Sequence, residues 1–272
     1  MSDDAVQALA IQVQRNAKYA HIAPELVERL VREEIAIRRN AKEVVKNTRR
    51  RLHQAGAVYM AGAPPYSHWL ADLRAAQGDR ERLEAVCRTA MAAHQSSRER
   101  LPLLARFYHE VLGDLAPVAS VLDLACGLNP LAIPWMPLAP GARYAACDVY
   151  TDLAAFLQEA LPLLGVEGTA GALDLSARTP DTVAGVALLL KTIPCLEQLD
   201  RSAGVRLLHE VRARHLVVSF PMQSLGGRRD RGMPAHYRAR FAELVQDQPW
   251  AVTEHVYESE LVFVIDKGKV PG

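Results

Sequence analysis

The 272-residue chain predicts an α/β protein in which a helical N-terminal region precedes a parallel β-sheet flanked by helices. Two observations predict this class. Residues up to about 110 show helical periodicity throughout, whereas from about residue 116 short β-rich runs alternate with helical ones. Several of those runs are continuously apolar, which is typical of strands buried on both faces of a parallel sheet.

The N-terminal region divides into helices separated by breakers. The first amphipathic segment is residues 22–39, in which Pro24 suits a first helical turn. A basic segment follows at residues 41–59, and the breaker at residues 62–65 ends it. Further helices are expected at residues 67–77, 79–94 and 98–112, the last of them capped by Ser96 or Ser97.

The second region supplies the strands. The apolar strand candidates are residues 118–124, 143–147, 186–190 and 215–220, with helices expected at 153–164 and 202–213. Two strand-like runs at 250–258 and 260–266 have almost nothing between them, so we expect an antiparallel pair. A parallel sheet finished by an antiparallel hairpin is the usual outline of a class I, Rossmann-like methyltransferase domain. We therefore expect a helical domain at residues 1–110 and such a domain at residues 111–272.

Composition bears on several functional classes. No stretch reaches the roughly 20 apolar residues of a membrane-spanning helix, and the N-terminus carries Asp3 and Asp4 instead of a signal pattern. We therefore expect a cytoplasmic protein. The four cysteines form no CxxC pair, which predicts reduced thiols and neither disulfides nor a metal site. The net charge of only +1 is unusually neutral for a protein that binds nucleic acid.

The segment after the first strand is the first candidate site. Asp123 ends an apolar run that leads into small residues from Ala125 to Gly127, followed by Asn129. Nucleotide-like ligands bind at the carboxyl ends of parallel strands, and small residues let the backbone approach them. Because Gly127 is the one glycine of this motif, the motif by itself predicts a cofactor site and an ordinary strand-to-turn junction about equally.

Two acidic residues at later strand ends favour the cofactor site. Asp148 ends the second strand 25 positions after Asp123, where a carboxylate can accept both ribose hydroxyls of a cofactor. Asp174 follows a third strand and can accept a hydrogen bond from an adenine amino group. Either residue alone is more often a turn or cap residue, but three acidic strand ends in this order predict a nucleoside-containing cofactor.

No acid/base or nucleophile constellation accompanies these carboxylates. Lys191 faces the substrate side of the predicted cleft, although a lysine that ends a buried strand usually reaches toward solvent. Cys195 follows Pro194, as in cytosine C5 methyltransferases, but the companion motifs are missing and we expect no catalytic role for it. Guanine N7 carries a lone pair and no proton, so its methylation needs only aligned partners, and this chemistry fits the sequence. We assign no catalytic residue and take Lys191 and Tyr108 as positioning candidates.

Six blocks of sequence are more specific in combination than any single motif. They are Arg51-Leu52-His53-Gln54 with Tyr59, His94-Gln95-Ser96-Ser97-Arg98-Glu99-Arg100, residues 128–136, residues 189–194, residues 219–228 with Gly232-Met233, and Glu260-Leu261-Val262. Together they span nearly the whole chain. This combination resembles the aminoglycoside-resistance 16S rRNA methyltransferases that modify N7 of guanine 1405.

The resemblance implies a four-helix N-terminal appendage beside a methyltransferase fold, with both contacting the 30S ribosomal subunit. It implies S-adenosyl-L-methionine as the cofactor, with Asp148 on the ribose and Asp174 near the adenine. It also implies resistance to 4,6-disubstituted deoxystreptamine aminoglycosides, and we expect a monomer. The cofactor contacts that we expect are His94, Asp123, Ala125, Gly127, Asn129, Asp148, Asp174, Leu175 and Lys191.

Basic residues gather in two places despite the neutral net charge. Such sets can meet phosphate, whose neutralisation dominates affinity for RNA, or can form an ordinary solvated face. The first set is Arg38, Arg39, Lys42, Lys46, Arg49, Arg50 and Arg51, and the second is Arg228, Arg229, Arg231, Arg238 and Arg240. Tyr108 and Tyr59 are candidates either for stacking on a flipped guanine or for a scaffold role.

The residues leave three alternatives open. The target could be another decoding-site nucleotide, for example N1 of an adenine. The chain could be a non-catalytic ribosome-binding protein that keeps a degenerate methyltransferase fold, since its first motif holds a single glycine. It could also be a small-molecule methyltransferase whose helical cap covers a substrate pocket.

Overall fold

A computed structural model of the chain describes residues 3–55, 63–222 and 232–268. Within these residues a seven-stranded sheet has the order β3-β2-β1-β4-β5-β7-β6, and β7 runs antiparallel to both of its neighbours. The strands are β1 (Val118–Leu124), β2 (Leu138–Asp148), β3 (Glu167–Ala172), β4 (Ala184–Leu190), β5 (Ala213–Pro221), β6 (Ala251–Val256) and β7 (Glu260–Asp266). The predicted parallel sheet with an antiparallel hairpin at its end is confirmed.

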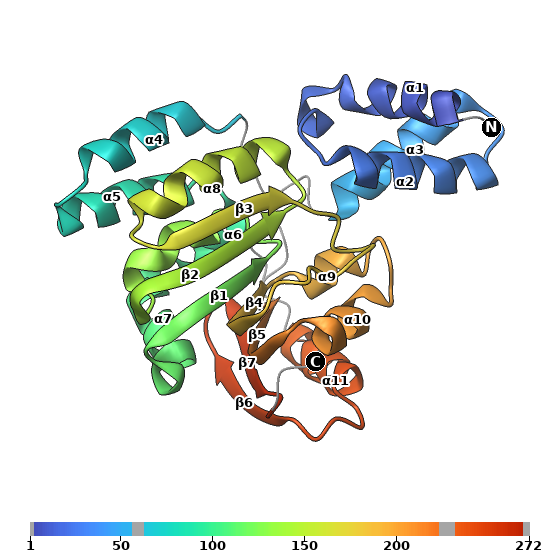
Figure 1. Ribbon diagram of the computed structural model, residues 1–272. Coiled ribbons are helices and arrows are strands. Elements are labelled where there is room, and N and C mark those ends of the chain that lie inside the picture. The colour runs from blue at the N-terminus through green and yellow to red at the C-terminus, as the bar shows by residue number, and fades with distance from the viewer. Residues whose placement is uncertain (1–2, 56–62, 223–231, 269–272) are drawn as a thin grey trace.

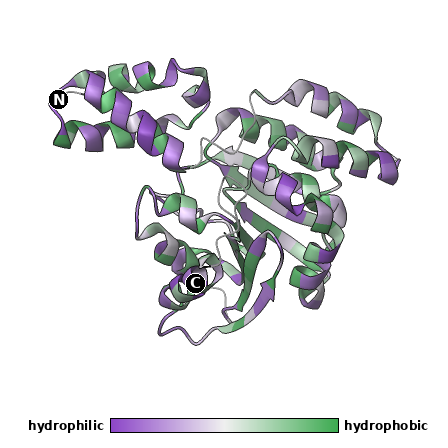
Figure 2. Ribbon diagram, turned by 180° about the vertical axis from the view of Figure 1, so that it is seen from behind, coloured by the Kyte–Doolittle hydropathy of each residue, from purple (hydrophilic) through white to green (hydrophobic). Residues whose placement is uncertain are grey.

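Helices cover both faces of this sheet (Figure 1). One face packs against α4 (Tyr66–Ala75), α5 (Arg80–Met91), α7 (Leu104–Leu112) and α8 (Thr151–Leu163). The other packs against α9 (Ile193–Leu196), α10 (Ala203–Glu210) and α11 (Met233–Leu244). Val121 lies in the first core and Leu122 in the second, because successive side chains of a strand point to opposite faces. Both faces are therefore buried, and the strands are largely hydrophobic (Figure 2).

Three further helices form a body of their own, which we call the helical unit (residues 3–55). They are α1 (Asp3–Gln14), α2 (Pro24–Ile37) and α3 (Ala41–Ala55). Val13, Leu30 and Leu52 belong to a core separate from the two cores of the sheet. Figure 1 shows this unit beyond the carboxyl ends of β2 and β3, whereas α4 and α5 lie against the sheet. The expected division of the chain after residue 110 stays a prediction.

The helix expected at residues 98–112 is wrong as a single element. The chain forms α6 (Gln95–Arg100), a 3₁₀ turn at Leu101–Leu103, and then α7. Pro102 has no N–H group and its ring opposes a continuous helix, so the axis breaks there. The expected serine cap is also wrong, because His94 occupies the N-cap position of α6 and no side-chain cap bond forms.

Other helical expectations are confirmed within a few residues. Pro24 begins α2, and Asp79 caps α5 by accepting a hydrogen bond from Arg82 N at 3.0 Å. The helix expected at residues 41–59 is seen as α3 up to Ala55, and its remainder lies outside the described residues. Helices α9 and α11 were not expected. No helix in the three described ranges combines the length and the apolar composition needed to cross a membrane.

Candidate functional site

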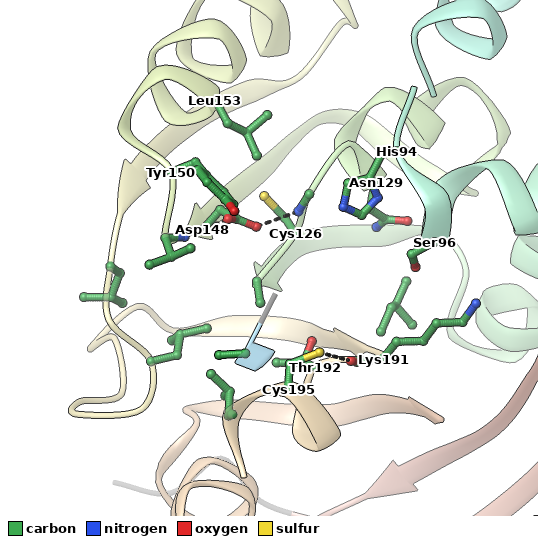
Figure 3. A pocket seen from close by; sticks show the side chains of 18 of the residues that line it. His94, Ser96, Cys126, Asn129, Asp148, Tyr150, Leu153, Lys191, Thr192 and Cys195 are labelled. Atoms are coloured by element: carbon green, nitrogen blue, oxygen red, sulfur yellow. Dashed lines mark hydrogen bonds between the residues drawn. The ribbon is translucent and has the colours of Figure 1, made fainter. Parts of the chain in front are cut away.

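A pocket opens at the carboxyl ends of the strands, where the adjacent strands β1 and β4 lead to opposite faces of the sheet. Ligands of open α/β sheets bind at such a switch point. Figure 3 shows Asp148 and Tyr150 on one side of the pocket, His94 and Asn129 on the other, and Cys195 below them in this view.

The pocket brings together the expected cofactor residues with the exception of Asp123. The expected residues that line it are His94, Ala125, Gly127, Asn129, Asp148, Asp174, Leu175 and Lys191. Asp123 is only 1% exposed and lies beneath the pocket, where its Oδ2 accepts hydrogen bonds from Asn129 Nδ2 at 2.8 Å and from Tyr144 OH at 2.6 Å. The structure therefore places Asp123 under Asn129 and away from the pocket surface.

The carboxylate of Asp148 is held by backbone groups. Its Oδ2 accepts a hydrogen bond from Gly127 N at 2.8 Å, and its Oδ1 accepts one from Val149 N at 2.7 Å. Burial raises the pKa of Asp148, and these backbone bonds oppose the rise. Each carboxylate oxygen has a second lone pair, so this fixed group can still accept the two hydroxyls of a ribose.

Asp174 lies in the loop after β3 and meets the helical unit. Its Oδ2 accepts a hydrogen bond from Arg29 Nε at 2.9 Å, and its Oδ1 accepts one from Ser176 N at 3.0 Å. The carboxylate is thus oriented from two sides. Ser176 Oγ also donates to Oδ1 at 2.5 Å. The second lone pair of Oδ2 therefore remains to accept a hydrogen bond from an adenine amino group.

A buried ion pair supports the floor of the pocket. Arg100 and Glu260 have side chains that are 1% and 0% exposed, and the guanidinium contacts both carboxylate oxygens, at 2.7 and 2.9 Å. Arg100 Nη1 also donates to Asn129 Oδ1 at 2.9 Å. Burial opposes ionisation of Glu260, but the charges of Arg100 and Lys191 and the hydrogen bonds from Arg100 and Ser219 together outweigh it and lower the pKa of this carboxyl. The pair ties the turn after β1 to β7.

The hydrogen-bond network extends from Asn129 to Tyr108, one of the two positioning candidates, and through Asp123 to Tyr144. Tyr108 OH donates to Asn129 Oδ1 at 2.5 Å, and the ring of Tyr108 is 1% exposed and does not line the pocket. Burial raises the pKa of Asp123 to about 7, against the hydrogen bonds from Asn129 and Tyr144. In this conformation Tyr108 does not line the pocket and contacts it through Asn129.

Arg100 and Glu260 were not among the expected site residues, although Arg100 lines the pocket. Each belongs to a block that carries the family resemblance, and Glu260 begins a strand whose next five residues are apolar. The sequence feature that could have indicated Glu260 as a site residue is a carboxylate at the start of an otherwise apolar, buried strand. Their pairing could not be predicted, because 160 positions separate them.

Gly127 packs directly against His94. The φ angle of Gly127 is +51°, and a Cβ added there would lie 2.8 Å from His94 Cε1. Burial lowers the pKa of His94 to about 4, with Arg100, Lys191 and Arg98 adding to the effect, so the ring is neutral at pH 7. The position therefore requires glycine both for its backbone conformation and for the space.

Gly127→Ala is expected to lower the free energy of unfolding by roughly 2–4 kcal/mol, because a positive φ and an overpacked contact each cost roughly 1–2 kcal/mol. Urea unfolding measures this change. In the Gly127→Ala protein, adding His94→Ala should remove the overpacked contact and recover the stability lost to it. The cost of the positive φ should remain. Gly113→Ala is the control, since Gly113 has a helical φ of −57° and a Cβ added there would meet no other atom within 4 Å. A Gly127→Ala midpoint equal to that of Gly113→Ala would contradict the prediction.

Lys191 lines the pocket at the end of β4 with a φ angle of +58°. Its Nζ lies 2.6 Å from Glu99 Oε2 of α6, so the side chain runs toward that helix. Cys195 lines the pocket as well, and its Sγ donates to Lys191 O at 3.4 Å. The positioning role of Lys191 stays a prediction.

The comparisons with known proteins cover almost the whole chain. The model of the family "Ribosomal RNA methyltransferase (FmrO)" matches residues 15–264. The chain belongs to this family. The predicted family and methyltransferase fold are thereby confirmed.

Individual relatives of this rRNA methyltransferase agree with the family model. The 16S rRNA (guanine(1405)-N(7))-methyltransferase of Micromonospora echinospora is 36% identical over 269 residues, which cover 97% of this chain and 98% of that protein. The protein of the same name from Frankia casuarinae is 39% identical over 97% of this chain and 94% of its own length. The crystal structure of 16S rRNA methyltransferase RmtF in complex with S-adenosyl-L-homocysteine matches with a TM-score of 0.82, 30% identity, and coverage of 98% and 99% of the two chains.

The first basic set of this rRNA methyltransferase divides into two groups. Arg38 and Arg51 pair with Glu34 and Glu33 at 2.7 Å, and Arg49 donates to two backbone carbonyls of the helical unit. The exposed members are Arg39, Lys42, Lys46 and Arg50. Of the second set, Arg238 pairs with Glu254 and Arg240 with Glu197, both at 2.6 Å. Arg228, Arg229, Arg231 and Tyr59 lie outside the described residues.

Proposed function

We propose that this protein transfers the methyl group of S-adenosyl-L-methionine to N7 of guanine 1405 in 16S rRNA. The observation that carries the proposal is the pocket at the switch point, where the carboxylate of Asp148 is fixed by Gly127 N and Val149 N. Relatives that bear this activity in their names align with 97% of the chain.

The residues present fit the cofactor. The fixed carboxylate of Asp148 suits the ribose, the loop at Asp174 and Leu175 suits the adenine, and Gly127 lets the backbone come close. When bound, S-adenosyl-L-methionine supplies an electrophilic methyl group on a sulfonium sulfur. Since guanine N7 needs no deprotonation, the chain has only to hold the two reactants in line and keep water out. His94, which lines the pocket, is neutral at pH 7 and so would add no positive charge that opposes binding of a cationic cofactor.

The assembled 30S subunit is the substrate that we propose, with the enzyme acting as a cytoplasmic monomer. The helical region would bind RNA, while residues 111–272 supply the carboxylates of Asp148 and Asp174 that hold the cofactor. A guanine in a helical target would have to be flipped into the pocket, at a cost of a few kcal/mol for unstacking. A methyl group and a fixed positive charge at N7 would then hinder a cationic aminoglycoside, so cells that express the protein should become resistant.

Transfer of labelled methyl to purified 30S subunits tests this proposal. Borohydride and aniline cleave RNA at N7-methylguanine, and we expect cleavage at guanine 1405. Incorporation without cleavage there would move the target to another nucleotide, such as N1 of an adenine. Absence of incorporation would favour a small-molecule substrate or a binding role without catalysis.

A stripe of positive charge on α3 supports the RNA-binding role. Lys42, Lys46 and Arg50 are exposed and follow one another at intervals of four, so they lie on one face of the helix. Within the described part of the chain, Lys42 and Arg50 have no ion-pair partner, and Lys46 lies 3.8 Å from Glu43. The stripe is therefore available to phosphate groups.

Charge reversal of this stripe by Lys46→Glu with Arg50→Glu is expected to weaken 30S binding on the order of tenfold and to reduce its salt dependence, because phosphate contacts release counterions. Binding assays at several salt concentrations measure both effects. Arg143→Glu is the matched control, since Arg143 is exposed in β2 away from the carboxyl ends of the strands. Equal 30S affinity for the two variants would contradict an RNA contact by the stripe.

A further inference from the structure

The helical unit supplies part of the wall of the cofactor pocket. Ile22 from the segment before α2, Leu26 from the first turn of α2, and Leu52 and Ala55 from the last part of α3 line the same pocket as the strand ends. These side chains are apolar, and they face a pocket whose polar groups come from the α/β body. A molecule bound there therefore contacts both bodies at once.

Backbone hydrogen bonds seat the unit on the loop that follows Asp148. Ala23 N donates to Val149 O at 2.8 Å, and Thr151 N donates to His21 O at 2.8 Å. Ile22 and Tyr150 form the antiparallel bridge between these two bonds. The loop that begins at the ribose carboxylate thus continues directly into the contact with the helical unit.

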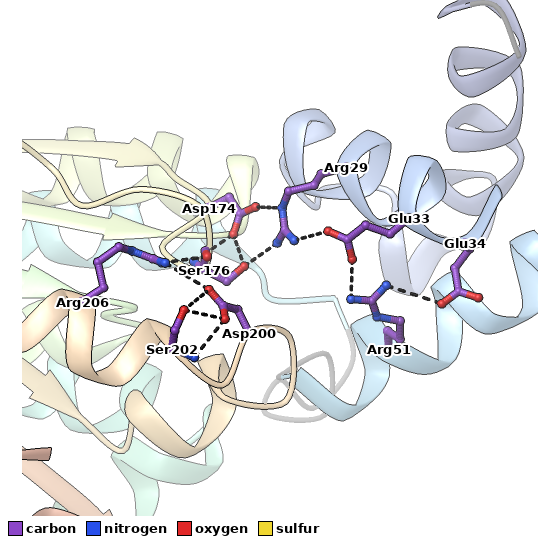
Figure 4. Close-up of polar contacts among 9 residues, drawn as sticks. All are labelled: Arg29, Glu33, Glu34, Arg51, Asp174, Ser176, Asp200, Ser202 and Arg206. Carbon is purple, nitrogen blue, oxygen red and sulfur yellow. Dashed lines mark hydrogen bonds and ion pairs between the residues drawn. The ribbon is translucent and has the colours of Figure 1, made fainter. Parts of the chain in front are cut away.

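A chain of ion pairs makes a second connection at the adenine end (Figure 4). Arg29 of α2 reaches Asp174 Oδ2 with its Nε at 2.9 Å and Glu33 Oε1 with its Nη1 at 2.7 Å. Glu33 Oε2 in turn accepts a hydrogen bond from Arg51 Nη2 of α3 at 2.7 Å. The side chain of Arg29 is 26% exposed and that of Asp174 is 5% exposed, so solvent screens this pair only in part.

We propose that the helical unit is one wall of the cofactor pocket, and that Arg29 is a positioning residue that makes cofactor binding and the seating of this unit depend on each other. Arg29 orients the carboxylate of Asp174 while leaving one lone pair of Oδ2 for the adenine. The cofactor contacts the apolar wall only when the unit is seated, so it binds the seated state more tightly. By linkage, the cofactor then stabilises the seated state by the same factor.

This inference rests on the proposed function, because the seated unit is the body that carries the Lys42, Lys46 and Arg50 stripe. Cofactor binding would fix the placement of that stripe relative to the pocket before RNA docks. The enzyme would therefore bind the ribosomal subunit more tightly when the methyl donor is present.

Calorimetric titration with S-adenosyl-L-homocysteine tests the first half of the proposal. We expect Arg29→Gln to weaken binding about fivefold to tenfold, and Arg29→Lys, which keeps the charge, to weaken it less. Arg32→Gln is the matched control on the same helix, because Arg32 is 52% exposed and pairs with Asp3 and Glu28 away from the pocket. Unfolding midpoints without ligand show whether each variant is folded. Equal affinity for Arg29→Gln and Arg32→Gln would overturn the proposal.

Hydrogen exchange with and without S-adenosyl-L-homocysteine tests the second half. In the wild type we expect the ligand to slow amide exchange in α2 and α3, and in Arg29→Gln at saturating ligand we expect this protection to shrink. Protection confined to the α/β body would overturn the proposal. Neither measurement needs RNA. A failure to methylate 30S subunits would therefore reject the proposed substrate, whereas the calorimetric and exchange data alone decide this inference.

Discussion

Replacing Arg100 by methionine is expected to lower the free energy of unfolding by about 3–5 kcal/mol, because it strands a buried partner of opposite charge. Glu260 is completely buried, and both of its short contacts with a positive charge are made by Arg100. Asn129 would also lose a donor to its Oδ1. Urea unfolding measures the loss, and cofactor affinity should fall with it because Asn129 lines the pocket.

Two further variants separate the cost of leaving Glu260 buried without a charged partner from the cost of losing the packing of Arg100. Arg100→Met combined with Glu260→Leu should recover much of the lost stability, since an apolar pair of similar volume is often as stable as a buried ion pair. Arg106→Met removes an arginine from the exposed pair with Glu110 and should leave the unfolding midpoint nearly unchanged. A single Arg100→Met variant that unfolds at the wild-type urea concentration would show that Glu260 finds compensation elsewhere.

Asp148→Asn is expected to weaken S-adenosyl-L-homocysteine binding on the order of 100-fold. Hydrogen bonds to charged groups contribute about 1.5–3 kcal/mol each, so two weakened ribose contacts amount to about 3 kcal/mol, or 100-fold in affinity. The asparagine would also turn an N–H₂ group toward either Gly127 N or Val149 N, both of which are donors. Calorimetric titration measures the affinity directly.

Asp152→Asn is the matched control for this variant. Asp152 lies in the first turn of α8, its Oδ1 accepts a hydrogen bond from Leu153 N, and it does not line the pocket. We expect its affinity for the ligand to stay within about twofold of the wild type, which corresponds to less than about 0.5 kcal/mol. If Asp148→Asn bound the ligand as tightly as this control, the ribose would have to be recognised by other groups.

Local patterns predicted the strands well and the segment around residue 100 poorly. The apolar run at residues 118–124 coincides with β1, because alternation and burial of a strand are set by the side chains of the strand itself. The helix expected at residues 98–112 fails at Pro102, whose missing N–H interrupts the helix before the amphipathic segment that forms α7. The prediction that Asp123, near the end of β1, contacts the cofactor pocket was wrong for another reason. Asp123 points into the core, because the alternation of a strand turns its side chain away from the pocket edge.

The sequence by itself determined the fold class, the family and the two strand-end carboxylates, Asp148 and Asp174, that line the pocket. These follow from periodicity and from blocks of neighbouring residues, whose geometry depends on the local backbone. Only the tertiary structure decided how charged groups pair across the chain. Arg100 and Glu260 are 160 positions apart, and Arg29 and Asp174 are 145 positions apart. Such partners meet only when separate helices and strands pack together, so the spacing of neighbouring residues in the sequence does not predict their pairing.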